Sequence, residues 1–61
     1  MLIDDIEVGQ RVVCPMDGTD VGVVQSIDDH DGIVYVLWPV LGVPGRTDVM
    51  DVDPGDLELA P

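Results

Sequence analysis

Apolar residues along this chain fall in short runs that alternate with polar positions, and this pattern predicts β-strands. No stretch keeps apolar residues at i, i+3, i+4 and i+7 over a dozen positions, so no long amphipathic helix is expected. Seven glycines and five prolines interrupt the runs every few residues, as at turns. The runs predict strands at residues 11–14, 21–27, 33–38, 46–50 and 57–59.

The connections between these runs carry residues typical of turns and breaks. Pro15 ends the first strand because proline cannot donate to a ladder. Gly22, inside the second run, predicts a bulge or sharp bend. Residues 28–32 end in Asp-Gly, which is typical of a tight hairpin. Residues 53–56 (DPGD) predict a turn that can hold one 3₁₀ turn.

The length of the chain limits it to one domain. Sixty-one residues leave no room for a second core, and a domain of this size buries only about 60% of the surface that its unfolded chain exposes. We therefore predict a single, marginally stable all-β domain over residues 1–61, a small five-stranded barrel. Residues 1–7 are expected to form an N-terminal arm or a short strand.

The run at residues 33–38 is apolar on both of its faces. Because side chains alternate across a strand, its even-numbered and odd-numbered residues point to opposite sides of a sheet. A barrel has one interior, so only one set can fill it. The only tryptophan of the chain favours the even set as the inner one, namely Val34, Val36 and Trp38. The odd set then needs another cover, namely Ile33, Tyr35 and Leu37.

Two kinds of cover for the odd set stay open. The apolar residues of the N-terminal arm, Leu2, Ile3 and Ile6, can fold over it. Otherwise the odd set is an exposed apolar patch, and such patches mark interfaces with a partner or with a second copy, which would allow a homodimer. On that interpretation the odd set is a protein-binding site, together with Arg46, a cation at the exit of a loop.

Acidic residues dominate the polar positions. Thirteen Asp and Glu stand against two Arg and no Lys, a formal net charge of -11. Phosphate backbones are bound mainly by Lys and Arg, so this charge argues against direct nucleic-acid binding. Three explanations stay open: the turn chemistry of aspartate, adaptation to high salt, and an acidic interaction surface. Seven aspartates fall at predicted turns: Asp17, Asp20, Asp28, Asp29, Asp31, Asp53 and Asp56.

Few residues could support catalysis. Ser26 is the only serine and lies within a predicted strand, where a Ser-His-Asp arrangement is difficult to build. His30 lies between two aspartates in a predicted turn, which offers no enclosed pocket for acid-base work. Cys14 is predicted to be a small core side chain rather than a nucleophile. We therefore predict that the protein is not an enzyme and has no cofactor.

Metal and membrane binding are not expected either. Residues 28–32 (DDHDG) resemble part of a calcium loop, but Ile27 and Trp38 would fall at its first and last ligand positions. The single cysteine can form neither an internal disulfide nor a cysteine-rich metal site. No apolar run approaches the roughly 20 residues that span a membrane. The expected location is the cytoplasm.

The first part of the chain carries a family-like motif. Residues 8–18 (VGQRVVCPMDG) and 22–27 (GVVQSI) resemble the opening of an SH3-like barrel of the Tudor or KOW type. More narrowly, they are similar to the RNA polymerase-interacting domain of CarD-type transcription regulators and transcription-repair coupling factors. Gln10, Cys14 and Asp17 stand where that family has aspartate, tyrosine and histidine. These 61 residues contain no counterpart of the helical DNA-binding domain of CarD-type proteins.

Three functions are consistent with these observations. The resemblance implies an SH3-like module that binds a protein in transcription, with RNA polymerase as the partner. The acidic surface indicates an alternative, a nucleic-acid mimic that occupies the basic groove of a DNA- or RNA-binding protein. Direct nucleic-acid binding is the third, and the charge opposes it. The lysine-poor composition also fits a compact high-GC genome, such as that of a bacteriophage or an actinobacterium.

Overall fold

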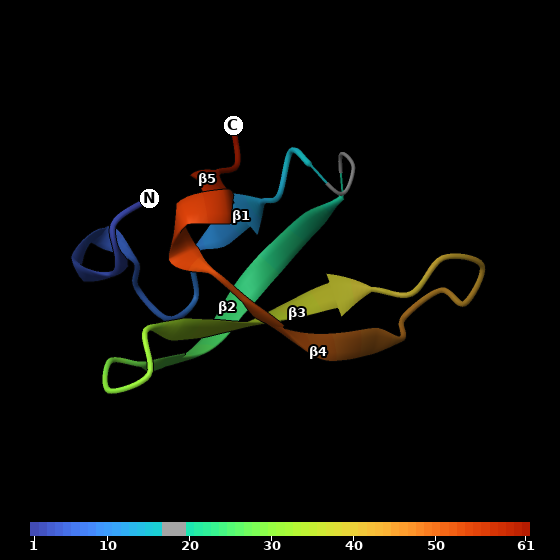
Figure 1. The fold of residues 1–61 in the computed structure, drawn as a ribbon. Helices are drawn as coiled ribbons and strands as arrows, with labels where there is room; N and C mark the ends of the chain where they lie inside the picture. Colours follow the sequence, from blue (N-terminus) through green and yellow to red (C-terminus); the bar gives the residue numbers. More distant parts are fainter. Residues whose placement is uncertain (17–19) are drawn as a thin grey trace.

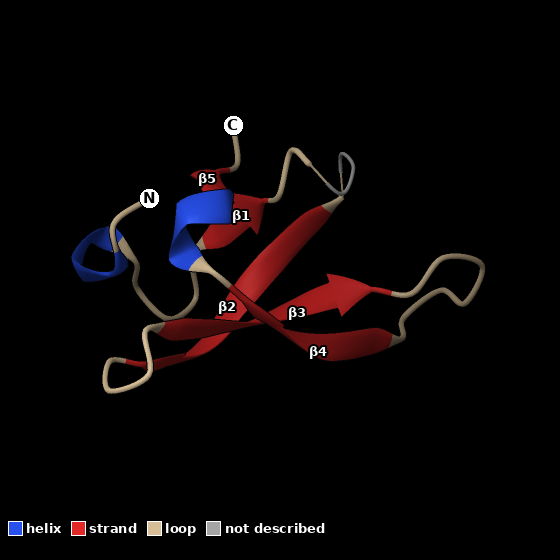
Figure 2. Cartoon of the chain, in the orientation of Figure 1, coloured by secondary structure: helices blue, strands red, loops and turns tan. Residues whose placement is uncertain are grey.

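The computed structural model describes residues 1–16 and 20–61, and its five strands form one antiparallel sheet (Figures 1 and 2). The strand order is β4-β3-β2-β1-β5, so the predicted all-β class is confirmed. Two short 3₁₀ turns accompany the sheet, η1 (Ile3–Asp5) and η2 (Pro54–Asp56). The strands are β1 (Arg11–Val13), β2 (Val21–Asp28), β3 (Ile33–Pro39), β4 (Thr47–Val52) and β5 (Glu58–Leu59).

The sheet is open rather than closed. Its two edges are β4 and β5, and no ladder joins them, so the closure that a barrel requires is absent from the strand pairing. The first three residues of β2 pair with β1, and β2 pairs with β3 from Val23 onward (Figure 1). β3 and β4 then continue as a ribbon at one end of a molecule that measures 34 × 19 × 17 Å.

The bulge of β2 does not lie at Gly22, where the sequence predicts it. The register with β3 shifts between Val24 and Ser26, while Gly22 pairs regularly with Val12. Gly22 serves a different purpose. A Cβ at this position would lie 2.5 Å from Cγ1 of Val36 and 2.7 Å from Cε3 of Trp38. Only a residue without a side chain lets these two side chains cross β2 so closely.

The core lies on one face of the sheet and confirms the predicted inner set. Val34 and Val36 are fully buried, and Trp38 packs against the core while remaining half-buried. Ile6, from the N-terminal arm, belongs to this core. The complete set of buried apolar residues is Ile6, Val12, Cys14, Val24, Val34, Val36 and Leu57.

The N-terminal arm therefore covers the inner set. The alternative in which the arm folds over the odd set of β3 is wrong. Ile3 packs on the same core as Ile6, while Leu2 is 74% exposed. The amino group of Met1 donates hydrogen bonds to the carbonyl oxygens of Pro54 at 2.9 Å and Leu57 at 3.0 Å. These contacts hold the arm against η2 and the segment leading to β5.

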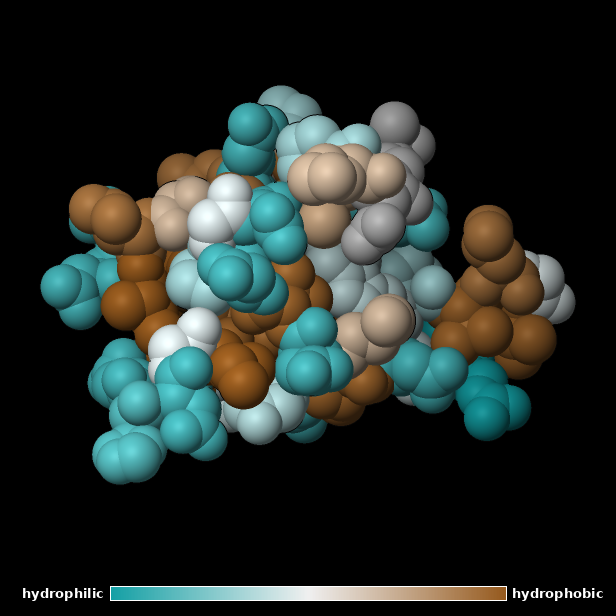
Figure 3. Space-filling model, viewed as in Figure 1, coloured by the Kyte–Doolittle hydropathy of each residue, from teal (hydrophilic) through white to brown (hydrophobic). Residues whose placement is uncertain are grey.

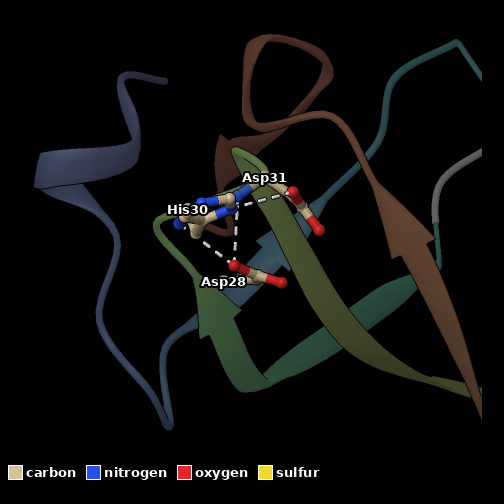
Figure 4. Close-up of polar contacts among 3 residues, drawn as sticks. All are labelled: Asp28, His30 and Asp31. Atoms are coloured by element: carbon tan, nitrogen blue, oxygen red, sulfur yellow. Dashed lines mark hydrogen bonds and ion pairs between the residues drawn. The ribbon is translucent and has the colours of Figure 1, made fainter.

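Aspartate forms two of the predicted turns. In the β2–β3 hairpin, Oδ1 of Asp28 accepts hydrogen bonds from the backbone N–H groups of His30 at 3.0 Å and Asp31 at 3.1 Å (Figure 4). Before η2, Oδ1 of Asp53 accepts from the N–H of Gly55 at 2.8 Å, and the predicted 3₁₀ turn is confirmed. Asp17, which was also predicted to lie in a turn, falls outside the described residues.

Most of the acidic side chains are exposed and unpaired with arginine. Thirteen acidic residues less Asp17 leave twelve that the structure describes, and all but Asp28 are exposed. Within the described part of the chain, neither Arg11 nor Arg46 forms an ion pair with a carboxylate; the pair found there joins His30 and Asp31. Repulsion among the carboxylates is thus balanced mainly by ions from solution.

We expect the free energy of unfolding in urea to rise by about 1 kcal/mol between about 10 mM and about 500 mM NaCl, because salt screens this repulsion. Urea is chosen because it adds no charge of its own. The double variant Asp4→Asn/Asp5→Asn removes two exposed charges from η1 and should show a smaller salt increment. Stability that is unchanged or lower in salt would contradict the interpretation.

Candidate interaction surfaces

The odd-numbered residues of β3 lie on the face of the sheet opposite the core. Ile33, Tyr35 and Leu37 are each half-buried. None of the three belongs to the buried core or to the described side chains that pack against it. β2 and β4 flank β3 on its two sides in the sheet.

The strand register adds two residues to this face that the sequence did not assign. Leu37 lies directly opposite Val23 in β2 and Val49 in β4. These two valines are 39% and 47% exposed, so three apolar side chains lie side by side across three strands. We call Val23, Leu37 and Val49 the outer apolar row. Val23 and Val49 could be assigned to this row only from the register in which the strands pair, and a single sequence does not contain that register.

Polar and aromatic residues border the outer apolar row. Tyr35, on the same face of β3, lies between Ser26 in β2 and Asp51 in β4. Beyond Val23, the opposite residue in β1 is the exposed Arg11. The row thus has an aromatic neighbour along the strand and a cation at one end.

Arg46, the fourth predicted binding residue, does not belong to this row. It is exposed and lies in the loop between β3 and β4, just before β4 begins at Thr47. Its carbonyl oxygen accepts from the N–H of Val40 at 2.9 Å, which places it opposite Val40. Val40 is three residues beyond Leu37, about 10 Å along the ribbon. The cation in register with Leu37 is Arg11 instead.

The loop between β3 and β4 is itself apolar and exposed. Leu41 is 86% exposed and Val43 44% exposed. Hydrophobic residues gather at the right end of the molecule in Figure 3, where Figure 1 places this loop. The loop lies at the end of the ribbon, away from the core.

A concave pocket of about 360 Å³ lies on the core side of the ribbon. Trp38, Met50 and Val52 provide its apolar walls. Four aspartates also line it: Asp20 before β2, Asp51 within β4, Asp53 before η2, and Asp56 within η2.

The sequence did not predict this pocket. Trp38 was expected inside a closed barrel, but the open sheet leaves this side chain half-buried beside a hollow. Alternation does signal that Trp38 faces the core side. The hollow itself depends on where η2 and the start of β2 come to lie, and no local pattern contains that information.

The three side chains considered for catalysis do not converge. Ser26 is exposed in β2, and Cys14 is buried after β1. The side chain of His30 is 96% exposed, with Nδ1 3.2 Å from Oδ1 of Asp31 (Figure 4). His30 thus lies on an open turn, outside the pocket described above. The absence of enzymatic activity stays a prediction.

Residues 1–16 and 20–61 hold no group of three or more His, Cys, Asp or Glu side chains placed to bind a metal ion. Within the same described residues, no helix has the length and apolar character needed to cross a membrane. No family model, curated protein or solved structure was found to match the chain.

Proposed function

We propose that the protein is a non-catalytic interaction module that docks on a protein partner through the outer apolar row. The observation that carries this proposal is the side-by-side arrangement of Val23, Leu37 and Val49 on the face opposite the core. The N-terminal arm does not cover this row, because Ile3 and Ile6 pack with the core on the other face and Leu2 is 74% exposed. A row of this kind is stabilised when a partner removes it from water.

The surroundings of the row suit a protein interface. Such interfaces place aliphatic and aromatic anchors at the centre and polar groups at the rim. Leu37 and Tyr35 are the anchors, and Arg11 and Asp51 supply the rim. The resemblance of residues 8–27 to CarD-type domains points to RNA polymerase as the first partner to test.

Substitution of Leu37 tests the proposal directly. We expect Leu37→Asp to raise the Kd for the partner by about tenfold or more, because it places a charge at the centre of the row. Tyr35→Ala should weaken binding less. The measurement is a titration of purified RNA polymerase, or of a partner captured from lysate and then purified, against the immobilised protein.

The matched control is Leu41→Asp, which makes the same change at a side chain that is 86% exposed and lies outside the row. It should change the Kd by less than about twofold. Far-UV circular dichroism checks that each variant is folded. Equal effects of the two substitutions would refute docking through the row. A concentration-dependent dimer that Leu37→Asp abolishes would instead assign the row to a second copy.

The acidic mimic is the second candidate, and a specific observation favours it. Eleven of the twelve described carboxylates are exposed, and none of the twelve is paired with arginine within the described residues. A mimic would compete with DNA or RNA for a basic protein. Its binding would fall steeply with salt and would tolerate Tyr35→Ala. Docking through the outer apolar row predicts instead that binding depends little on salt and is weakened by Tyr35→Ala.

A further inference from the structure

We infer that the pocket beside Trp38 receives an arginine side chain from a partner polypeptide. This inference rests on the proposed function, since it gives the interaction module a second contact on the other side of the sheet. The pocket volume of about 360 Å³ lies at the small end of the range for ligand sites, about 300–1,000 Å³. A pocket of this size has room for one long side chain.

The charge around the pocket selects a cation. Asp20, Asp51, Asp53 and Asp56 line it, and all four are exposed. Within residues 1–16 and 20–61, no arginine forms an ion pair with any of them. Oδ1 of Asp53 accepts from Gly55, but its second oxygen has lone pairs for another donor. In a chain of net charge -11, this rim attracts cations and repels anions.

The apolar walls select a cation with a long stem. Met50 and Val52 can contact the methylene groups of a long basic side chain while its charged end reaches the rim. Trp38 adds the strongest aromatic partner for a cation. Its ring lies close over Gly22, since Cε3 and Cζ3 lie 2.7 and 2.9 Å from where a Cβ of Gly22 would be.

Arginine fits these groups better than lysine. A planar guanidinium stacks on aromatic rings and offers five donors, which can reach two carboxylates together. The ammonium of lysine is a strongly hydrated point charge without that geometry. The pocket offers both an aromatic ring and carboxylates. Arginine can stack on the first and donate hydrogen bonds to the second.

Trp38 provides the readout, because it is the only tryptophan of the chain and lines the pocket. The probes are hexa-arginine and hexa-lysine peptides with blocked ends, titrated against the intact protein at low salt. We expect a saturable change in Trp38 emission, with a Kd about threefold or more tighter for the arginine peptide. No change in emission would overturn the inference, and equal affinity for the two peptides would overturn the choice of arginine.

A pair of matched variants separates the pocket from the general acidic field. Asp56→Asn should weaken hexa-arginine binding by about fivefold or more, because it removes a carboxylate of the rim. Asp4→Asn makes the same change in net charge on η1, which does not line the pocket, and should have less than about a twofold effect. Equal effects would show that the peptide binds the acidic field alone.

The outer apolar row is tested in the same titration. Leu37→Asp should leave hexa-arginine binding unchanged, because Leu37 lies on the face opposite the core. If the peptide fails to bind while Leu37→Asp still abolishes partner binding, only this inference fails. If peptide binding depends on Asp56 while partner binding ignores Leu37, only the proposed function fails.

Discussion

Replacing Gly22 by alanine should lower the free energy of unfolding by about 1–3 kcal/mol, the usual cost of overpacking a filled core. The new Cβ would lie 2.5 Å from Cγ1 of Val36 and 2.7 Å from Cε3 of Trp38. Val36 is fully buried and has no room to retreat, so Trp38 or the backbone of β2 must shift. Urea denaturation followed by far-UV circular dichroism measures the loss.

Gly32→Ala is the matched control for this substitution. Gly32 has a φ of +68°, and a Cβ there would meet nothing within 4 Å, so the cost comes from backbone conformation alone. Its loss should be about 1 kcal/mol. The near-UV circular dichroism of Trp38 should change in Gly22→Ala and stay unchanged in Gly32→Ala. A Gly22→Ala protein with wild-type stability and an unchanged tryptophan signal would contradict the close contact.

The strands could be predicted from the sequence because their signals are local. Alternation divided residues 33–38 into two sets, and the only tryptophan favoured the one that contains Val34 and Val36, both of which are fully buried. Glycine, proline and aspartate also marked the hairpin at residues 28–32 and the 3₁₀ turn of Pro54–Asp56. These patterns involve residues close together in the chain, so one sequence is enough to identify them.

Features that depend on pairing between strands could not be predicted. The bulge between Val24 and Ser26 contains no glycine. Gly22 has the sequence pattern of a bulge, but it is needed for close contact with residues more than a dozen positions away in the chain. The same limit applies to the outer apolar row. Leu37 could be assigned by alternation, but Val23 and Val49 join it only through the register.

The structure also changes the interpretation of the charge. Many aspartates lie at predicted turns, and a local role in those turns would account for them without a binding surface. Of the described aspartates, only Asp28 and Asp53 accept backbone hydrogen bonds through their side chains. Most of the other carboxylates are exposed, including Asp20 and Asp56 beside the pocket. Turn chemistry therefore explains only a small part of the net charge of -11.

Truncation of Leu57 should have the largest effect on stability. Leu57 is 1% exposed and lies in the core between η2 and β5. A buried Leu→Ala change costs about 2–5 kcal/mol through lost burial and the cavity left behind. A 61-residue domain has roughly 3–9 kcal/mol of total stability. Leu57→Ala should therefore remove much of the cooperative urea transition, measured by circular dichroism.

Leu59→Ala provides the control, because it makes the same change two residues later at a side chain that is 57% exposed. Its cost should stay below about 1 kcal/mol, since a surface leucine loses little burial. Because Leu57 contacts the core that also holds Ile6, its loss should loosen the N-terminal arm as well. Proteolysis within residues 1–8 should then accelerate in Leu57→Ala and not in Leu59→Ala. Equal stability of the two variants would mean that the core does not depend on the segment after η2.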